Sequence, residues 1–360
     1  MQKTNKNKMN HNKTKQQNYQ PIYMKSLATT VLCLMAGVMP MHAEEDKPTV
    51  HLNLQTRASY VNDRIGSEVQ HDASGMKGDY LFLSLYGNIN DRLSYNWRQR
   101  VNSKITRNDI FEATDWIYID YKLTKNWSIS AGKQVIMVGS WEYDRNPIDI
   151  YTPSEYWNNV APFKFGASIV YTTTNGNDRF ITQASESMYN EPQHHDLMGY
   201  SLYWAGKHGI LSTQYSANLM EYAPSRYISF IGLGNRLDIN NASLEFDFIN
   251  RAASHQTYLF KDCSVIARLD YRIIPELAIY GKLAYDVNKS GVEADKSVTN
   301  GTELTTYGGG LEYYPMKGKP DLRVNLSIAH TTGTNTNPAG TNVDNKTMVK
   351  VGVAAKLHLL

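Results

Sequence analysis

Charged and aromatic side chains gather in one stretch, residues 136–163, which is the longest segment between two predicted strands. Its ionisable residues are Glu142, Asp144, Arg145, Asp149 and Glu155. Opposite charges held at a narrow, water-filled passage sort small solutes by charge and polarity. The stretch is therefore a candidate constriction loop. The alternative is that Arg145 pairs with its acidic neighbours and only holds the shape of the loop.

A second set of charges lies at alternate positions of predicted strands, where side chains share one face. These bases are Arg57, Arg98, Arg100 and Lys122 early in the chain, and Arg268, Arg272, Lys282, Arg323 and Lys350 late in it. Acids interleave with the late group, so we expect pairs there with Glu245, Asp247, Asp270 and Asp286. The early group has only Asp120 nearby. We therefore expect the loop acids to face the early arginines and to set up a transverse field.

The sequence offers little for catalysis or metal binding. His194 and His195 precede Asp196, but neither HExxH spacing nor a neighbouring cysteine accompanies them. No G-x-S-x-G motif is present, and the triplet Gly308–Gly310 falls inside a predicted strand rather than before a helix. We expect no enzyme activity, no cofactor and no metal.

The elements that must hold these charges are strands with two unlike faces. In residues 50–60, VHLNLQTRASY, one parity is apolar and ends in Tyr60, while the other is wholly polar and contains Arg57. Such a strand fits a soluble sandwich with its apolar face at the core. It equally fits an outer-membrane barrel with that face towards lipid. One strand does not decide between them.

Sixteen segments carry such a strand pattern, and their connections alternate between long and short. The predicted strands are 50–60, 80–89, 93–101, 113–123, 127–135, 164–173, 179–187, 198–205, 210–221, 227–238, 242–251, 263–273, 277–287, 307–314, 322–329 and 347–360. The short connections hold the Asn, Asp, Gly and Pro of tight turns, and the fifth long one, 222–226, is an exception in length. This alternation predicts an all-β, transmembrane, antiparallel up-and-down β-barrel with long loops outside the cell.

Aromatic residues near strand ends fit the girdles of such a barrel at the two membrane interfaces. They are Tyr60, Tyr80, Trp127, Tyr203, Trp204, Tyr222, Tyr313 and Tyr314. The alternative is the ordinary preference of Tyr and Trp for strands.

The first 43 residues are predicted to be a secretory signal peptide. Residues 26–43 form a short apolar run that follows lysines and ends at Ala43, before Glu44, and Met24 would make an alternative start. The leader holds six lysines, so residues 44–360 carry 31 basic and 34 acidic residues, a net charge near −3. This balance speaks against a nucleic-acid partner. One cysteine, Cys263, remains after the leader, so an internal disulfide is excluded.

Residues 132–173, GKQVIMVGSWEYDRNPIDIYTPSEYWNNVAPFKFGASIVYTT, resemble the porins of Bacteroides-type bacteria and, more distantly, the phosphate-selective porin O and P family. The resemblance implies a trimeric, sixteen-stranded pore with its third loop folded inward. We therefore expect an outer-membrane porin that passes small hydrophilic solutes or ions by diffusion. Its partners would be outer-membrane lipid, lipopolysaccharide, the solutes and two further copies of itself. The alternatives are a barrel-based adhesin or receptor and, third, a lipid-active barrel enzyme.

Overall fold

The computed structural model describes residues 48–102, 111–190, 196–254, 259–316 and 319–360. The predicted signal peptide, residues 1–43, and the pair His194 and His195 lie outside the described residues. None of the helices in these ranges is long and apolar enough to cross a membrane.

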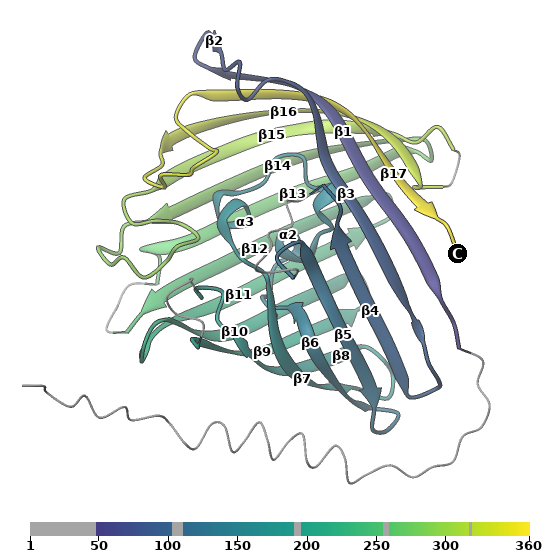
Figure 1. Ribbon diagram of the computed structural model, residues 1–360. Coiled ribbons are helices and arrows are strands. Elements are labelled where there is room, and N and C mark those ends of the chain that lie inside the picture. The colour runs from purple at the N-terminus through teal and green to yellow at the C-terminus, as the bar shows by residue number, and fades with distance from the viewer. Residues whose placement is uncertain (1–47, 103–110, 191–195, 255–258, 317–318) are drawn as a thin grey trace, which may run out of the picture. The chain divides into compact units, whose positions relative to one another are not determined.

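The described chain from Pro48 onward forms one antiparallel sheet that closes on itself (Figure 1). Its strands are β1 (His51–Ile65), β2 (Glu68–Val69), β3 (Gly75–Asn88), β4 (Leu93–Arg100), β5 (Thr114–Lys122), β6 (Trp127–Val135), β7 (Phe163–Thr172), β8 (Asp178–Glu186), β9 (Met198–His208), β10 (Leu211–Ala223), β11 (Arg226–Ile239), β12 (Ala242–Ala253), β13 (Asp262–Ile274), β14 (Leu277–Asn288), β15 (Glu303–Tyr313), β16 (Leu322–Thr334) and β17 (Lys346–His358). The two-residue β2 belongs to a hairpin between β1 and β3, so the barrel has the sixteen strands that the sequence predicts.

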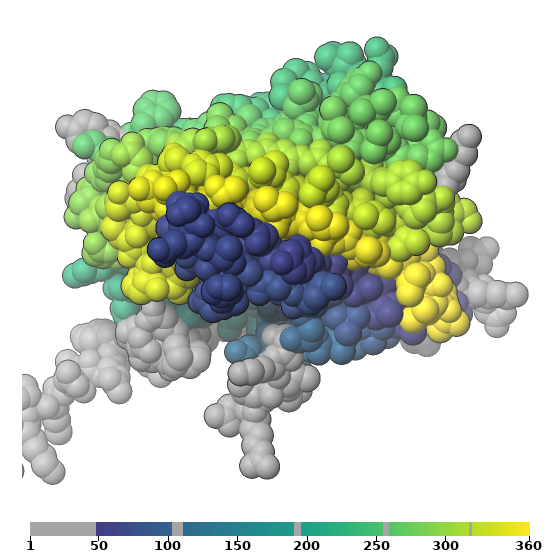
Figure 2. Space-filling view, turned by 90° about the horizontal axis from the view of Figure 1, so that it is seen from above, coloured from purple at the N-terminus to yellow at the C-terminus, as the bar shows by residue number. Residues whose placement is uncertain are grey.

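Closure occurs between the first and last strands. β1 pairs with β17 along its length, with Arg57 opposite Ala354. Figure 2 shows the purple atoms of the first strand lying against the yellow atoms of the last. A closed sheet leaves no strand edge whose amide groups would lack partners in lipid.

The two faces of each strand separate as the parity pattern predicts. In β12, Leu244 and Phe246 are 45% and 46% exposed on the outside, while Glu245 and Asp247, which alternate with them, are buried inside. In β1, Arg57 and Ser59 are buried and Tyr60 faces outward. The apolar face is therefore on the outside and the polar face lines the interior. This arrangement is that of an outer-membrane barrel rather than a sandwich.

Long and short connections alternate as predicted, although the bounds of several connections differ. The first long connection, predicted between the strands 50–60 and 80–89, is shorter than expected because β1 continues to Ile65 and β3 begins at Gly75. The fifth connection is only the pair 224–225, where Ser225 takes a positive φ of 59°. Both differences extend the strands, because paired backbone continues past the point where the apolar alternation fades.

The wall of the barrel is lower on one side. The five consecutive strands β4 to β8 have eight to ten residues each. The other barrel strands have eleven to fifteen. A membrane-spanning strand needs about 9–11 residues. The low wall, β4–β8, is therefore at the lower limit of what spans a bilayer.

An aromatic ladder crosses five neighbouring strands near the short-turn end. Its members lie opposite one another in register: Trp127, Tyr171, Phe180, Trp204 and Tyr215. The rings of Phe180 and Trp204 are nearly parallel, with an interplanar angle of 8°. Such a row is typical of an interfacial girdle. Tyr80 and Tyr203 do not belong to it: Tyr80 lies beneath the Arg57 guanidinium, and Tyr203 shares the parity of the buried Ser201.

The face assignment predicts unequal effects of two neighbouring substitutions. Leu244→Arg places a charge on the lipid face and should lower the free energy of unfolding by about 2 kcal/mol, between the values for the interface and the midplane. Ser243→Arg points into the lumen, opposite Asp270 in register, and should fold normally. Urea unfolding in lipid vesicles, followed by heat-modifiable mobility, measures both. Equal losses of stability would mean that the two faces are wrongly assigned.

Candidate pore constriction

The third long loop, residues 136–162 and hereafter L3, contains the helices of the barrel interior. These are α2 (Trp141–Asp144), the short 3₁₀ helix η1 (Pro147–Asp149) and α3 (Glu155–Asn159). Ser140 caps α2 and Ser154 caps α3, each accepting a hydrogen bond from a backbone N–H three residues on. Figure 1 shows α2 and α3 inside the ring of strands. The prediction that the third loop folds inward is confirmed.

Two wall carboxylates bind the N-termini of these helices. Asp247 on β12 accepts hydrogen bonds from the N–H groups of Trp141 and Glu142, both at 2.9 Å, and from the Ser140 hydroxyl. Asp286 on β14 accepts one from the N–H of Glu155 at 2.8 Å. A carboxylate at the first turn of a helix satisfies N–H groups that have no partner within the helix. The wall thus caps both helices of the loop.

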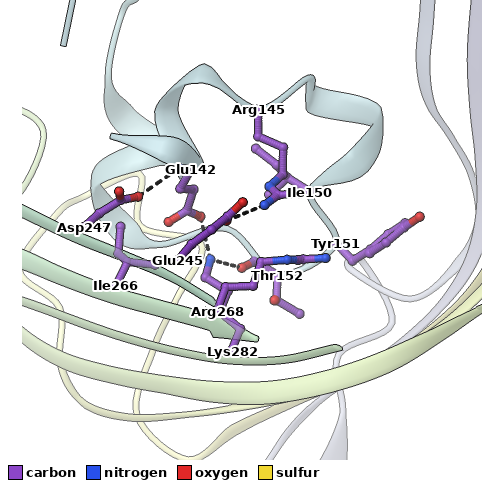
Figure 3. A pocket seen from close by; sticks show the side chains of 10 residues that line it. All are labelled: Glu142, Arg145, Ile150, Tyr151, Thr152, Glu245, Asp247, Ile266, Arg268 and Lys282. Carbon is purple, nitrogen blue, oxygen red and sulfur yellow. Dashed lines mark hydrogen bonds and ion pairs between the residues drawn. The ribbon is translucent and has the colours of Figure 1, made fainter. Parts of the chain in front are cut away.

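Two ion pairs join L3 to β12 and β14 (Figure 3). In one the base is on the wall, and in the other the base is on the loop. The Lys282 ammonium on β14 donates to Glu142 of α2 and to the carbonyl of Thr152. The Arg145 guanidinium donates to Glu245 on β12. Only about 10 Å³ of free space remains among these groups. The contact is therefore a tightly packed latch rather than a solute site.

Two further arginines hold η1. Arg57 on β1 donates to the carbonyls of Ile148 at 3.1 Å and Ile150 at 2.7 Å, and its Nε donates to Asp79 at 2.9 Å. Arg323 on β16 donates to the Ile148 carbonyl and to Asp149. These contacts fix the middle of L3 against the junction of the first and last strands.

Apolar side chains fill the interior behind L3. The cluster comprises Ile136, Val138, Tyr143, Tyr156, Met188, Tyr189, Met220, Ile228, Phe230, Ile249, Ala253, Ala294 and Val298. It joins L3 to inward positions of β10–β12 and to the loops after β8 and β14. Beside it, the fully buried Arg251 binds Asp262 at 2.9 Å and Asp295 at 2.6 Å. These side chains pack L3 against the inner face of β10–β12.

The opposite face of L3 borders a cavity of about 480 Å³. On the wall it is lined by residues of β3–β7, and on the loop by residues of α2, η1 and the end of α3. The described lining carries three arginines, Arg98, Arg100 and Arg145, against two carboxylates, Asp115 and Asp144. We call this space the L3 cavity. The latch lies on the other side of L3, and the L3 cavity is larger than the two other described spaces that border L3, which have about 170 Å³ and 250 Å³.

One carboxylate is paired with two arginines on the wall of the L3 cavity. Asp115 on β5 binds the Nε of Arg98 at 2.7 Å and that of Arg100 at 2.8 Å. The Arg98 side chain is buried, whereas that of Arg100 is 39% exposed. This group of three residues therefore presents one net positive charge to the lumen, on Arg100.

The expected pairing of charges is wrong in three respects. The early arginines have acidic partners, Asp79 for Arg57 and Asp115 for Arg98 and Arg100, whereas Asp120 is hydrogen-bonded by Ser130. The loop acids meet late bases instead of early arginines. Among the expected late pairs the structure contains Arg268 with Asp270, at 2.7 Å, but Asp247 and Asp286 cap helices.

The remaining predicted residues are spread over the interior. Asp144 of L3 accepts a hydrogen bond from Gln214 at 3.1 Å. Glu155 is fully buried, and burial raises the pKa of its carboxyl. Lys350 on β17 lies 3.9 Å from Asp79. Lys122 and Arg272 lie near the short-turn end, where Lys122 is exposed and Arg272 donates to the carbonyl of Pro275. Among the described residues, no group of His, Cys, Asp and Glu could hold a metal ion.

Sequence reasoning missed Asp79, Asp115 and the inward apolar positions. Asp79 falls in a segment predicted as loop, and Asp115 lies within a register shift between β4 and β5. Phe230 and Ile249 occupy the lumenal parity of their strands, so alternation alone suggests polar residues there. The one available signal was their position at the long-loop ends of β11 and β12.

The fold and the interior together define a class of protein. A closed sixteen-stranded barrel with an apolar exterior, a polar lumen and a loop folded into it is an outer-membrane porin channel. The model of the family described as phosphate-selective porin O and P matches residues 50–243, more than half of the sequence. The chain belongs to this family. None of the curated proteins matches it.

Solved structures share the fold at low sequence identity. The chain is similar to the anion-selective porin from Comamonas acidovorans, with a TM-score of 0.62 and 10% identity over 86% of this chain and 100% of that chain. It is similar to OmpT of Vibrio cholerae in its trimer form, with a TM-score of 0.59 and 14% identity over 87% and 100%. The outer membrane channel DcaP of Acinetobacter baumannii gives a TM-score of 0.58 and 12% identity over 86% and 97%. These likenesses show the fold alone.

Proposed function

We propose that solutes cross this porin between L3 and the wall formed by β3–β7. The observation that carries the proposal is the one-sidedness of L3. Its caps and ion pairs reach β1, β12, β14 and β16, while the L3 cavity opens on the other side. In this arrangement Asp144 and Arg145 of the loop line the same cavity as Arg98 and Arg100 of the wall, while the Arg145 guanidinium also binds Glu245 in the latch. Glu142, Asp149 and Glu155 serve as anchors.

The charge of the L3 cavity supports a weak preference for anions. Arg100 carries the surplus charge, and a low-dielectric wall focuses its field on passing ions. A surface receptor or adhesin built on a barrel would not need this open passage. The test is single-channel recording of purified protein in planar bilayers. Discrete conductance steps with a reversal potential on the anion side support the proposal, whereas an electrically silent barrel contradicts it.

The low wall supports assembly into homotrimers. At eight residues, β4 is shorter than the roughly 9–11 that span a bilayer, and a neighbouring subunit would cover this mismatch. OmpT, which shares the fold, is described in a trimer form. Native mass spectrometry tests the assembly. A three-chain species agrees with the proposal, and a monomer in mild detergent rejects it.

Cleavage of residues 1–43 as a signal peptide and insertion with long loops outward complete the proposal. Lipopolysaccharide would then surround the long-loop end. The resemblance of residues 132–173 to Bacteroides-type porins supports a source among such bacteria.

The orientation gives a second prediction. An epitope tag at Asn337, in the long loop between β16 and β17, should be labelled on intact cells. A tag at Asn240, in the two-residue turn between β11 and β12, should be labelled only after permeabilisation, because short turns of such barrels face the periplasm. Labelling of Asn240 alone on intact cells would invert the orientation.

A further inference from the structure

The L3 cavity has an aromatic lining that a simple aqueous passage does not need. Six rings contribute to it: Tyr80, Phe82, Trp116, Tyr143, Trp157 and Phe163. By contrast, among the described residues a space of about 170 Å³ beside β15–β17 has one aromatic lining residue, Tyr151, and one of about 250 Å³ near the β7–β8 and β9–β10 turns has only Trp141. Aromatic surface with a few placed polar groups is typical of a binding site.

The rings on the wall are held in place before any solute arrives. The Arg98 guanidinium lies 3.6 Å from the centre of the Trp116 ring and 4.8 Å from that of Phe82. Its Nε is bound to Asp115, and Phe163 meets Trp116 edge-on at 5.8 Å. A ring array fixed by stacking and an ion pair loses little side-chain entropy when a solute packs on it.

Polar groups of both kinds surround these rings. Arg100 and Arg145 donate hydrogen bonds, while Asp115 and Asp144 accept them. Within the described residues, Asn146 Oδ1 and Asn158 Nδ2, on the loop side, have no hydrogen-bond partner. An anion would be attracted by Arg100, but it would make no use of the hydrogen-bond acceptors Asp115 and Asp144. A hydroxyl group donates and accepts, so it is suited to the whole lining.

We propose that the L3 cavity is a transient binding site for neutral sugars of one or two pyranose rings. This inference rests on the proposed route through L3 and names the solute class for it. The C–H faces of a pyranose ring are apolar and pack against aromatic faces, while its hydroxyls meet the charged and amide groups. The volume of about 480 Å³ lies within the range of small-molecule sites. A weak site speeds selective passage because the solute both enters and leaves.

Open-channel block in planar bilayers tests the proposal, with maltose as the probe. Maltose should interrupt the current in a saturable manner, whereas polyethylene glycol of equal hydrodynamic size should reduce it without saturation. Trp116→Ala and Trp157→Ala should each raise the dissociation constant of maltose about two- to tenfold, since each removes one stacking surface. Trp127→Ala removes the same side chain from the outer girdle and should leave the constant unchanged.

Two outcomes with maltose overturn the sugar site. One is a maltose effect that never saturates or that equals the effect of polyethylene glycol. The other is saturable block that all three tryptophan variants leave unchanged. Benzoate blocking more tightly than maltose would also overturn it, because the site would then be one for aromatic anions. Should Trp116→Ala not fold, Trp157→Ala on the loop decides the matter. The salt conductance of the unblocked channel is measured in the same membranes, so a failed sugar site is distinguished from a failed pore.

Discussion

Alanine at both Asp247 and Asp286 will raise the single-channel conductance and its fluctuations while the barrel still folds. These carboxylates cap α2 and α3 from the wall, so their removal leaves buried N–H groups without partners. Each loss should cost roughly 2 kcal/mol, which is a roughly 30-fold rise in the population of released loop. L3 then moves away from its latch, and the width of the narrowest section of the lumen fluctuates.

Asp120→Ala is the matched control for this pair. Asp120 is also a wall carboxylate, on β5, but it is hydrogen-bonded by Ser130 and is not among the groups that bind L3. Its replacement should leave conductance and current noise at the level of the unaltered protein. If the double variant conducts with the same step size and noise as this control, the two carboxylates do not hold the loop.

A charge series at Arg100 will shift the reversal potential stepwise towards cations. With Arg98 and Asp115 retained, Arg100→Gln makes the local charge neutral and Arg100→Glu makes it negative. One unit charge at 4 Å in water is worth about 1 kcal/mol, so each step should lower the permeability of anions and raise that of cations, each roughly fivefold. Reversal potentials under a salt gradient measure the ratio.

Salt and position provide the controls for the series. The shifts should be large near 0.01 M salt and small near 1 M, where screening acts over about 3 Å. Lys122→Gln removes the same charge at the short-turn end and should shift the reversal potential little. Equal shifts from Lys122→Gln and Arg100→Gln would show that Arg100 does not lie at the constriction. Unaltered selectivity of the Arg100→Glu channel would show the same.

Alternation of residue types predicted the barrel because every strand contacts lipid with one face and the polar interior with the other. Leu244 faces lipid and Glu245 faces the interior, so adjacent positions carry residues of opposite polarity. The inward course of L3 came from its length and from resemblance. Its partners did not, because Lys282 is 140 positions away from Glu142 in the sequence and no local pattern encodes such a distance.

The partners of the acidic residues on the wall could not be predicted from the local sequence either. A carboxylate that caps a helix on another segment looks the same in sequence as one that pairs with a base. Asp247 and Asp270 both alternate with apolar residues, yet one binds two loop N–H groups and the other binds Arg268. The difference depends on where α2 begins in space, which only the folded chain defines.

Thiol modification of a cysteine placed at Trp157 tests the central claim, that the conducting path runs between L3 and the β3–β7 wall, most directly. A water-soluble thiol reagent should reduce the single-channel conductance of Trp157→Cys. It should leave the conductance of two controls unchanged. One is Leu202→Cys, because Leu202 is 59% exposed on the outer surface, and the other is the unaltered channel, because Cys263 is buried. An unchanged current through modified Trp157→Cys would show that ions take another route and would contradict the account.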